Sequence, residues 1–293
     1  MGRRSFVSAW LLTAALVQAA GCGRIGLRFR NDPNPIPPQK LEHIRQISEK
    51  AQAEIDRGDY ESARCDLVSL VNEEPDSPEA LQRLGTVLMH QGRSAEAESL
   101  FQAALARDPD YVDAMLGLGQ IEAQRGDTIN ALKRFEMAIA IDPRRPRAYF
   151  FLGQAREAVG QVDEALAAYF RALEADPNDV ATIARVAAIQ LGRNQPDQAL
   201  VRLDQAVELA PTDGEVRVLR GLAHAKLHHI PEAIADLKDA ARRLPDRPDV
   251  YYQLALVLEA GHRTADARSA AEQALRLAPA DIAVRQLSER LRR

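Results

Sequence analysis

The 293-residue chain has little of several features that would each point to a class of protein. Its two cysteines are too few for a disulfide framework, and aromatic residues make up only 5% of it. The sequence has 38 Lys and Arg residues and 42 Asp and Glu residues, and the two signs are interspersed along the chain. A basic surface for binding nucleic acid is therefore not expected. Alanine and leucine dominate instead. They favour an all-α fold, because neither loses much rotamer freedom in a helix.

Motifs for catalysis are also missing. The sequence contains no GxSxG, HExxH, Walker loop or CxxC pair. Gly117 and Gly119 form a Gly-x-Gly, but they lie inside a predicted helix with no strand before it, so they cannot cradle a phosphate. We therefore expect no enzyme activity, no catalytic residue and no cofactor.

The N-terminus has the pattern of an export signal. Arg3 and Arg4 precede an uncharged apolar stretch that ends near Val17, which is shorter than the roughly 20 residues of a transmembrane helix. Residues 1–21 are therefore predicted to be a signal peptide of the lipoprotein type. Residues 3–7 also resemble the twin-arginine motif, so both the general secretory route and the twin-arginine route stay open.

The end of this signal resembles a bacterial lipobox, in which small residues precede a cysteine that is diacylated and becomes the new N-terminus. The stretch is Ala19, Ala20, Gly21 and Cys22. Ala19 stands where that family usually has leucine, which leaves ordinary signal-peptidase cleavage or a retained anchor as alternatives. The resemblance implies that Cys22 is lipidated and that the protein faces the periplasm or the cell exterior, with the outer membrane favoured in a Gram-negative cell. Residues 22–43 are rich in proline and are predicted to form the tether behind that cysteine.

Internal repetition is the strongest signal in the chain. Proline recurs every 34 residues, at Pro75, Pro109, Pro143, Pro177, Pro211, Pro245 and Pro279. This pattern resembles the tetratricopeptide repeat family, which implies a right-handed α-solenoid of helical hairpins. Seven repeats cover residues 44–281 without an insertion, as 44–77, 78–111, 112–145, 146–179, 180–213, 214–247 and 248–281. Residues 282–293 are predicted to form a capping helix, begun by Asp281, whose apolar side carries Ile282, Val284, Leu287 and Leu291.

Positions within each repeat, numbered from 1 at Ile44, show which residues pack. Position 8 is always glycine or alanine, and position 20 is always alanine, as expected where the two helices of a hairpin approach closely. Position 15 is glycine in the first four repeats, which suits a turn with positive φ. Position 24 is a large apolar residue in the first six repeats: Leu67, Phe101, Phe135, Tyr169, Leu203 and Leu237.

In tetratricopeptide proteins, first-helix positions 2, 5, 6, 9, 12 and 13 line a concave groove that receives extended peptides. The first three repeats lack the residues with which chaperone-binding members hold a peptide carboxylate. Apolar residues gather at these positions in later repeats, and we expect them to bind a partner. They are Phe150, Phe151, Val218, Leu219, Leu222, Tyr252 and Leu256. The alternative is that they are partly buried between adjacent first helices or covered by the capping helix.

Repeat 6 departs from the pattern. Arg217, Arg220 and His224 stand at positions 4, 7 and 11, which are normally apolar. They form a candidate polar site for a partner's carboxylate. The alternative is that the arginines pair with carboxylates such as Asp236 or Asp239, because buried charge is costly unless paired.

The histidines of the last two repeats have an ordinary explanation. His224 and His228 have a helical i, i+4 spacing that suits metal ligands. His228 and His262, however, occupy the turn at position 15. We therefore expect no metal site.

The whole arrangement resembles bacterial lipoproteins that help to assemble envelope complexes. We expect a non-catalytic scaffold or adaptor tethered to a bacterial membrane by its lipid anchor. Its partner would be another protein or a peptide in the groove, and not nucleic acid. The alternatives are a self-associating structural organiser, or an accessory subunit of an export or polysaccharide-synthesis machine.

Overall fold

The computed structural model describes residues 18–19, 23–24 and 38–292. Two short strands, β1 (Gln18–Ala19) and β2 (Gly23–Arg24), pair antiparallel near the N-terminus. Cys22, the predicted lipidation residue, lies outside the described residues, as does most of the predicted signal peptide.

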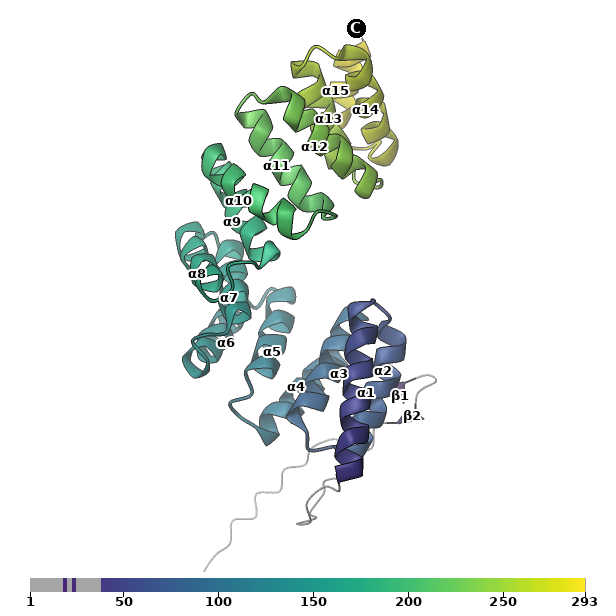
Figure 1. Cartoon of the computed structure of the whole chain (residues 1–293), viewed down its shortest axis with the longest axis vertical. Helices are drawn as coiled ribbons and strands as arrows, with labels where there is room; N and C mark the ends of the chain where they lie inside the picture. The colour runs from purple at the N-terminus through teal and green to yellow at the C-terminus, as the bar shows by residue number, and fades with distance from the viewer. Residues whose placement is uncertain (1–17, 20–22, 25–37, 293) are drawn as a thin grey trace, which may run out of the picture. The chain divides into compact units, whose positions relative to one another are not determined.

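From Pro38 onwards the described chain consists of fifteen helices joined by short connections (Figure 1). The first helices of the repeats are α1 (Pro38–Asp56), α3 (Pro78–His90), α5 (Val112–Gln124), α7 (Pro146–Ala158), α9 (Val180–Gly192), α11 (Gly214–Lys226) and α13 (Pro248–Ala260). The second helices are α2 (Tyr60–Glu73), α4 (Ser94–Arg107), α6 (Thr128–Ile141), α8 (Val162–Ala175), α10 (Pro196–Leu209), α12 (Ile230–Arg243) and α14 (Thr264–Leu277). The last helix is α15 (Ile282–Arg292). The predicted all-α fold of seven hairpins and a closing helix is confirmed.

The helices group into two compact units. Unit 1, Met1–Pro143, contains α1 to α6, and unit 2, Arg144–Arg293, contains α7 to α15. Within each unit the two helices of a hairpin pack against each other. Second helices also pack against the first helix that follows them, as α2 does against α3 and α12 against α13. No hairpin therefore has to bury its apolar face alone.

The helix boundaries follow from local chemistry. Each second helix ends two residues before a repeat proline. The residue between the helix end and the proline has ψ between 62° and 98°, outside the helical range, as expected for a residue that precedes proline. Side-chain caps begin several helices, for example Asp59 at α2 and Ser77 at α3. Helix α1 begins at Pro38, six residues before the predicted repeat start, so the end of the predicted tether is helical. Proline suits the first turn of a helix, because its missing N–H has no partner there.

Position 8 and position 24 form the contact at the centre of each hairpin. In repeat 3, a Cβ added to Gly119 would lie 2.5 Å from the Phe135 ring, and in repeat 4 one added to Gly153 would lie 2.6 Å from the Tyr169 ring. Hairpins with alanine at position 8 carry the smaller Leu67, Leu203 or Ala271 at position 24. Repeat 6 pairs Gly221 with Leu237, and a Cβ added there would lie 2.8 Å from the leucine. The two positions therefore share the space at this contact, so that a larger residue at one leaves less room at the other.

Phe101 makes this contact twice. Its ring lies against Gly85 of its own hairpin and against Gly117 of the next one, where an added Cβ would lie 2.6 Å and 2.5 Å from it. Phe101 is completely buried. This explains the Gly-x-Gly of α5: both of its glycines make room for aromatic rings, Phe101 against Gly117 and Phe135 against Gly119.

Helix α15 closes unit 2 by packing on α14. The Asp281 carboxylate accepts hydrogen bonds from the backbone N–H groups of Ala283 and Val284, which confirms the predicted cap. Val284, Leu287 and Leu291 are buried as predicted, but Ile282 is 65% exposed. The assignment of Ile282 to the buried side was wrong, because this first residue of the helix lies outside the stripe that faces α14.

Position 15 has a positive φ in all seven repeats. Glycine occupies it in the first four, and Asn194, His228 and His262 hold it at φ of 56°, 60° and 57° in the last three. Side chains with a Cβ are strained in this region by about 1–2 kcal/mol. The hairpin geometry of the repeat thus imposes the left-handed conformation at position 15, whichever residue occupies that position.

This strain predicts a stabilising substitution. We expect His262→Gly to raise the free energy of unfolding by about 0.5–1 kcal/mol, because glycine removes the strain at the cost of extra entropy in the unfolded chain. Ala260→Gly, at the end of α13, is the matched control and should destabilise, since that residue is helical. Urea denaturation followed by circular dichroism measures both. Equal effects of the two glycines would contradict the prediction.

Candidate functional site

The predicted groove residues lie on three first helices of unit 2, α7, α11 and α13, with α9 between α7 and α11 in the chain. We call these residues together the first-helix surface. Six of the seven predicted residues are half-buried there: Phe150, Phe151, Leu219, Leu222, Tyr252 and Leu256. A half-buried side chain is held in place by its contacts with the core and still exposes part of its apolar surface to solvent. A side chain at a binding surface needs both properties.

Core contacts account for part of this surface. Val218 is only 8% exposed and belongs to the core cluster of α11 to α15, so its assignment to the groove is corrected. Leu222 and Leu256 pack against the same cluster, and Phe150 packs against the Tyr169 ring at 5.9 Å between centroids. Partial burial, which the sequence left open as the alternative, thus applies fully to Val218 and partly to Leu222, Leu256 and Phe150, of which Phe150 contacts α8 of its own hairpin.

A small pocket adjoins the aromatic end of this surface. It has a volume of about 320 Å³ and is lined by Gln154, Glu157, Ala158 and Arg185. Glu157 accepts a hydrogen bond of 2.9 Å from the Tyr169 hydroxyl and lies 3.8 Å from the Arg185 guanidinium. Burial, helped by this hydrogen bond, raises the pKa of Tyr169 above its usual value, so the hydroxyl stays a donor to Glu157. Arg185 is 49% exposed, which leaves its guanidinium within reach of a bound segment.

Phe151 lies at the rim of the same surface. Its ring meets the Phe150 ring edge-on at 5.5 Å, and the Arg147 guanidinium lies 5.8 Å from its centroid. A cation over an aromatic face stabilises both groups. Phe151 is therefore an aromatic ring with one arginine, Arg147, beside it, while Arg185 belongs to the pocket with Glu157.

The corresponding surface of unit 1 is polar. Helices α1 and α3 form a pocket of about 560 Å³ there, whose lining includes Ser48, Gln52, Glu79 and Arg83. Arg83 donates to the Ser48 hydroxyl at 2.8 Å and pairs with Glu79 at 2.8 Å. The two units therefore present different chemistry on their first helices.

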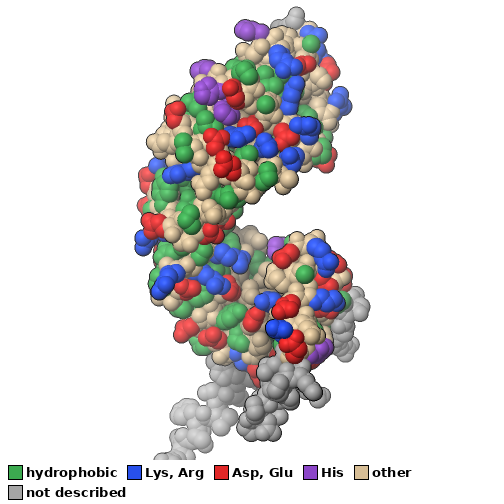
Figure 2. Space-filling model, in the orientation of Figure 1, with side chains coloured by type: hydrophobic (Ala, Val, Ile, Leu, Met, Phe, Trp, Pro, Cys, Tyr) green, Lys and Arg blue, Asp and Glu red, His purple; other side chains and the backbone are tan. Residues whose placement is uncertain are grey.

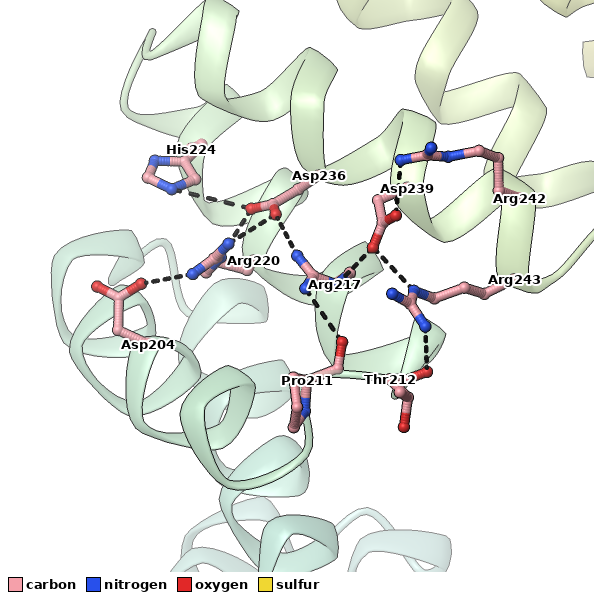
Figure 3. Close-up of polar contacts among 10 residues, drawn as sticks. All are labelled: Asp204, Pro211, Thr212, Arg217, Arg220, His224, Asp236, Asp239, Arg242 and Arg243. Atoms are coloured by element: carbon pink, nitrogen blue, oxygen red, sulfur yellow. Dashed lines mark hydrogen bonds and ion pairs between the residues drawn. The ribbon is translucent and has the colours of Figure 1, made fainter.

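The charged residues of repeat 6 form a paired cluster (Figure 3). Asp236, on α12, is 4% exposed and accepts two hydrogen bonds of 2.7 Å from Arg220, one from Nε and one from Nη2. Arg217 lies 3.4 Å from the same carboxylate and 2.6 Å from Asp239. The Asp236 carboxylate raises the pKa of Arg220 above its usual value through these hydrogen bonds.

This geometry matches the pairing alternative for repeat 6. Val216 and Ala223 are buried and Leu219 is half-buried, so α11 turns its apolar side inwards while its arginines pair. Arg220 also donates to Asp204 of α10 at 3.1 Å, which links repeats 5 and 6. Both arginines are thus engaged within the protein, and a partner's carboxylate would have to compete with Asp236.

Sequence reasoning named Asp236 as a partner but missed that its position in the repeat, position 23, pairs with the first helix in other repeats as well. In repeat 1 the same position is Asp66, which pairs with Lys50 of position 7 at 2.8 Å. In repeat 3 it is Arg134, which pairs with Glu122 of position 11 at 2.7 Å. Repeat 2 has leucine at all three positions. The sequence did contain a signal for these ion pairs: a charged residue at position 7 or 11 occurs together with the opposite charge at position 23 of the same repeat.

Charge and apolar exposure elsewhere on the surface are mixed. Figure 2 shows basic and acidic side chains interspersed on the face in view, without a field of one sign. Among the described residues, seven large apolar side chains are exposed, and three of them lie on α6: Ile129 (69%), Met137 (54%) and Ile141 (39%). Among the described helices, none combines the length and apolar character needed to cross a membrane.

Comparison with protein-family models gives a consistent match. One model described as tetratricopeptide repeat matches residues 48–111, 83–146 and 218–282, and a second model of the same description matches residues 122–189. No curated protein sequence matches the chain significantly.

Solved structures share the fold at low sequence identity. The Cut9–Hcn1 complex of the APC/C matches with a TM-score of 0.73 and 17% identity over 82% of this chain, which spans 48% of that protein. A tetratricopeptide repeat protein from Parabacteroides merdae matches with a TM-score of 0.55 and 18% identity, covering 86% of this chain and 100% of that one. YrrB, a repeat protein with an unusual peptide-binding site, matches with a TM-score of 0.54 and 19% identity, covering 64% and 97%.

Proposed function

The chain belongs to the tetratricopeptide repeat family, and from this premise we propose that it is a non-catalytic scaffold for protein–protein interaction, tethered to a bacterial membrane, that helps to assemble an envelope complex. The first-helix surface of unit 2 carries the proposal. It combines half-buried apolar side chains with a pocket that holds Arg185 and Glu157. An extended segment with apolar side chains would complete their burial, which is the main favourable term in association. The peptide-binding site of YrrB, in a protein of the same fold, supports this use of the surface.

A double substitution tests the binding surface. Phe151→Ser with Tyr252→Ser should weaken capture of the partner by about tenfold or more, since each half-buried ring gives up roughly 1 kcal/mol of further burial. Helical content and the unfolding transition should change little. The partner is first obtained by crosslinking and pull-down from native envelopes, and the dissociation constant is then measured with purified components.

The matched control is Ile282→Ser, an exposed apolar residue away from this surface, which should leave binding unchanged. Binding should resist added salt, because burial and not charge drives it. Parallel loss of fold and binding in the double variant would assign the rings to the core. Strong salt sensitivity would instead point to Arg83, Arg185 and the arginines of repeat 6.

Attachment to the membrane has its own test. Labelled palmitate should enter the wild-type protein, and Cys22→Ser should release the protein to the soluble fraction, because the diacylated cysteine would be the only anchor. Ile282→Ser, at an exposed residue of the last helix, is the matched control and should keep both label and membrane retention. Unchanged retention without label in all three proteins would refute the lipid anchor while leaving the interaction surface untouched.

The exposed apolar residues of α6 favour a second candidate, a self-associating organiser. Most other repeats place charged or small residues at the positions of Ile129, Met137 and Ile141. Light scattering across a concentration series distinguishes the candidates: a self-associating organiser gains mass with concentration and loses this behaviour in Ile129→Ser with Met137→Ser. A scaffold for other proteins keeps a constant mass.

A further inference from the structure

Two histidines come together at the turn of the sixth hairpin. His224 lies in the last turn of α11, and His229 is the residue that caps the start of α12. Their Nδ1 atoms are 3.4 Å apart. From the sequence, the i, i+4 spacing suggested His224 and His228 as a pair. In the structure, His228 has the positive φ that reverses the chain direction. His229, and not His228, therefore lies next to His224.

This separation is the one that a shared metal ion requires. Imidazole nitrogens bind Zn²⁺ at about 2.0–2.1 Å, and at a tetrahedral angle two such nitrogens lie about 3.4 Å apart. The two Nδ1 atoms already have this spacing without an ion. The two nitrogens are therefore close enough to bind one ion together; a proton held by either Nδ1 would leave to solvent or move to the Nε2 atom of the same ring.

The surroundings of His224 favour the ligating form of the ring. Its Nε2 lies 4.0 Å from the Asp236 carboxylate, and Figure 3 shows the ring turned towards that residue. At 4.0 Å this is a charge contact and not a hydrogen bond; a carboxylate on this side of the ring favours the N–H on Nε2 and thus a lone pair on Nδ1, the nitrogen that faces His229. Asp236 is itself fixed by the two hydrogen bonds from Arg220, so it holds its place behind the ring.

We propose that His224 and His229 form a two-histidine site for a divalent transition metal of the Zn²⁺ and Cu²⁺ class. Imidazole selects these ions over Mg²⁺ and Ca²⁺, which prefer oxygen. No group of three or more His, Cys, Asp or Glu ligands occurs in the described part of the chain, so two coordination positions stay open for water or for a side chain of a bound protein. The His224 side chain is 14% exposed while His229 is exposed, which places the open positions towards solvent. This departs from the sequence expectation of no metal.

Titration calorimetry on the full chain without a polyhistidine tag tests the site. ZnCl₂ should bind at one ion per chain, and MgCl₂ should give no binding. His224→Ala and His229→Ala should each weaken Zn²⁺ binding by about tenfold or more, the scale on which altered ligation acts. Circular dichroism checks that each variant is folded.

His228→Asn and His262→Asn are the matched controls, because asparagine tolerates the positive φ of both turns. Both should bind Zn²⁺ like the wild type. The proposal is overturned by an absence of saturable Zn²⁺ binding, by unchanged binding in the His224→Ala, His229→Ala double variant, or by an equal loss in His262→Asn.

Discussion

Replacing Asp236 with alanine is expected to lower the free energy of unfolding by about 3–5 kcal/mol, the scale measured when one partner of a buried ion pair is removed. Asp236 is 4% exposed and carries both hydrogen bonds of Arg220. Its removal leaves that guanidinium at the α11–α12 contact with only the exposed Asp204 as a carboxylate partner, and it takes one of the two carboxylates from Arg217. Urea denaturation followed by circular dichroism gives the change.

Asp204→Ala is the matched control. It removes another carboxylate from the same Arg220 at a similar distance, 3.1 Å, but the Asp204 side chain is 54% exposed. Exposed ion pairs contribute about 0–1 kcal/mol, because water replaces the lost partner. Equal effects of the two substitutions would show that burial is not what makes Asp236 important.

A transplant from repeat 7 tests the same idea in reverse. Repeat 7 carries Tyr251, Leu254, Leu258 and Ala270 at positions 4, 7, 11 and 23. Giving repeat 6 this set, as Arg217→Tyr, Arg220→Leu, His224→Leu and Asp236→Ala, should recover the stability lost in Asp236→Ala. Apolar residues often replace a buried ion pair without loss, since the desolvation cost of the charges disappears with them. A transplant less stable than Asp236→Ala would contradict this account.

Phe135→Ala is expected to destabilise the protein by a similar amount, about 3–5 kcal/mol, by opening a cavity at the centre of the third hairpin. Phe135 is 1% exposed, and its ring fills the space above Gly119. Met137→Ala, two residues along the same helix, removes a side chain that is 54% exposed and should cost no more than about 0.5 kcal/mol. Both values follow from urea denaturation.

The shared volume of positions 8 and 24 makes the prediction sharper. Gly119→Ala alone should cost about 1–3 kcal/mol, because its methyl group would overlap the Phe135 ring. Combining it with Phe135→Leu recreates the Ala and Leu pair of repeats 1 and 5, so the double variant should be more stable than the sum of the two single changes implies. Strict additivity would show that the two positions do not share a volume.

Regular features of the chain were readable from the sequence because they repeat. The 34-residue step predicts the number of hairpins, the proline that ends each second helix, and the small residue at position 8. Each of these depends on backbone geometry or on contacts inside one hairpin, which are the same in every repeat. The Asp281 cap is similarly local, since it involves only the next three residues.

Exposure and pairing were decided by the tertiary structure. Val218 and Leu219 are neighbours in sequence and both apolar, yet one is core and the other half-buried, because the rotation of α11 depends on what packs on either side. Asp236 could be named as a partner for the arginines, but its burial follows only from how α12 lies on α11.

The contact between His224 and His229 shows the same division. The sequence by itself determined that repeat 6 has a turn at position 15 and histidines around it. Only the tertiary structure decided which of them meet, because a left-handed residue between two helices swings the following side chain back towards the first helix. Periodicity determines the hairpin, while the geometry of its turn and the packing of its neighbours determine which chemical groups it brings together.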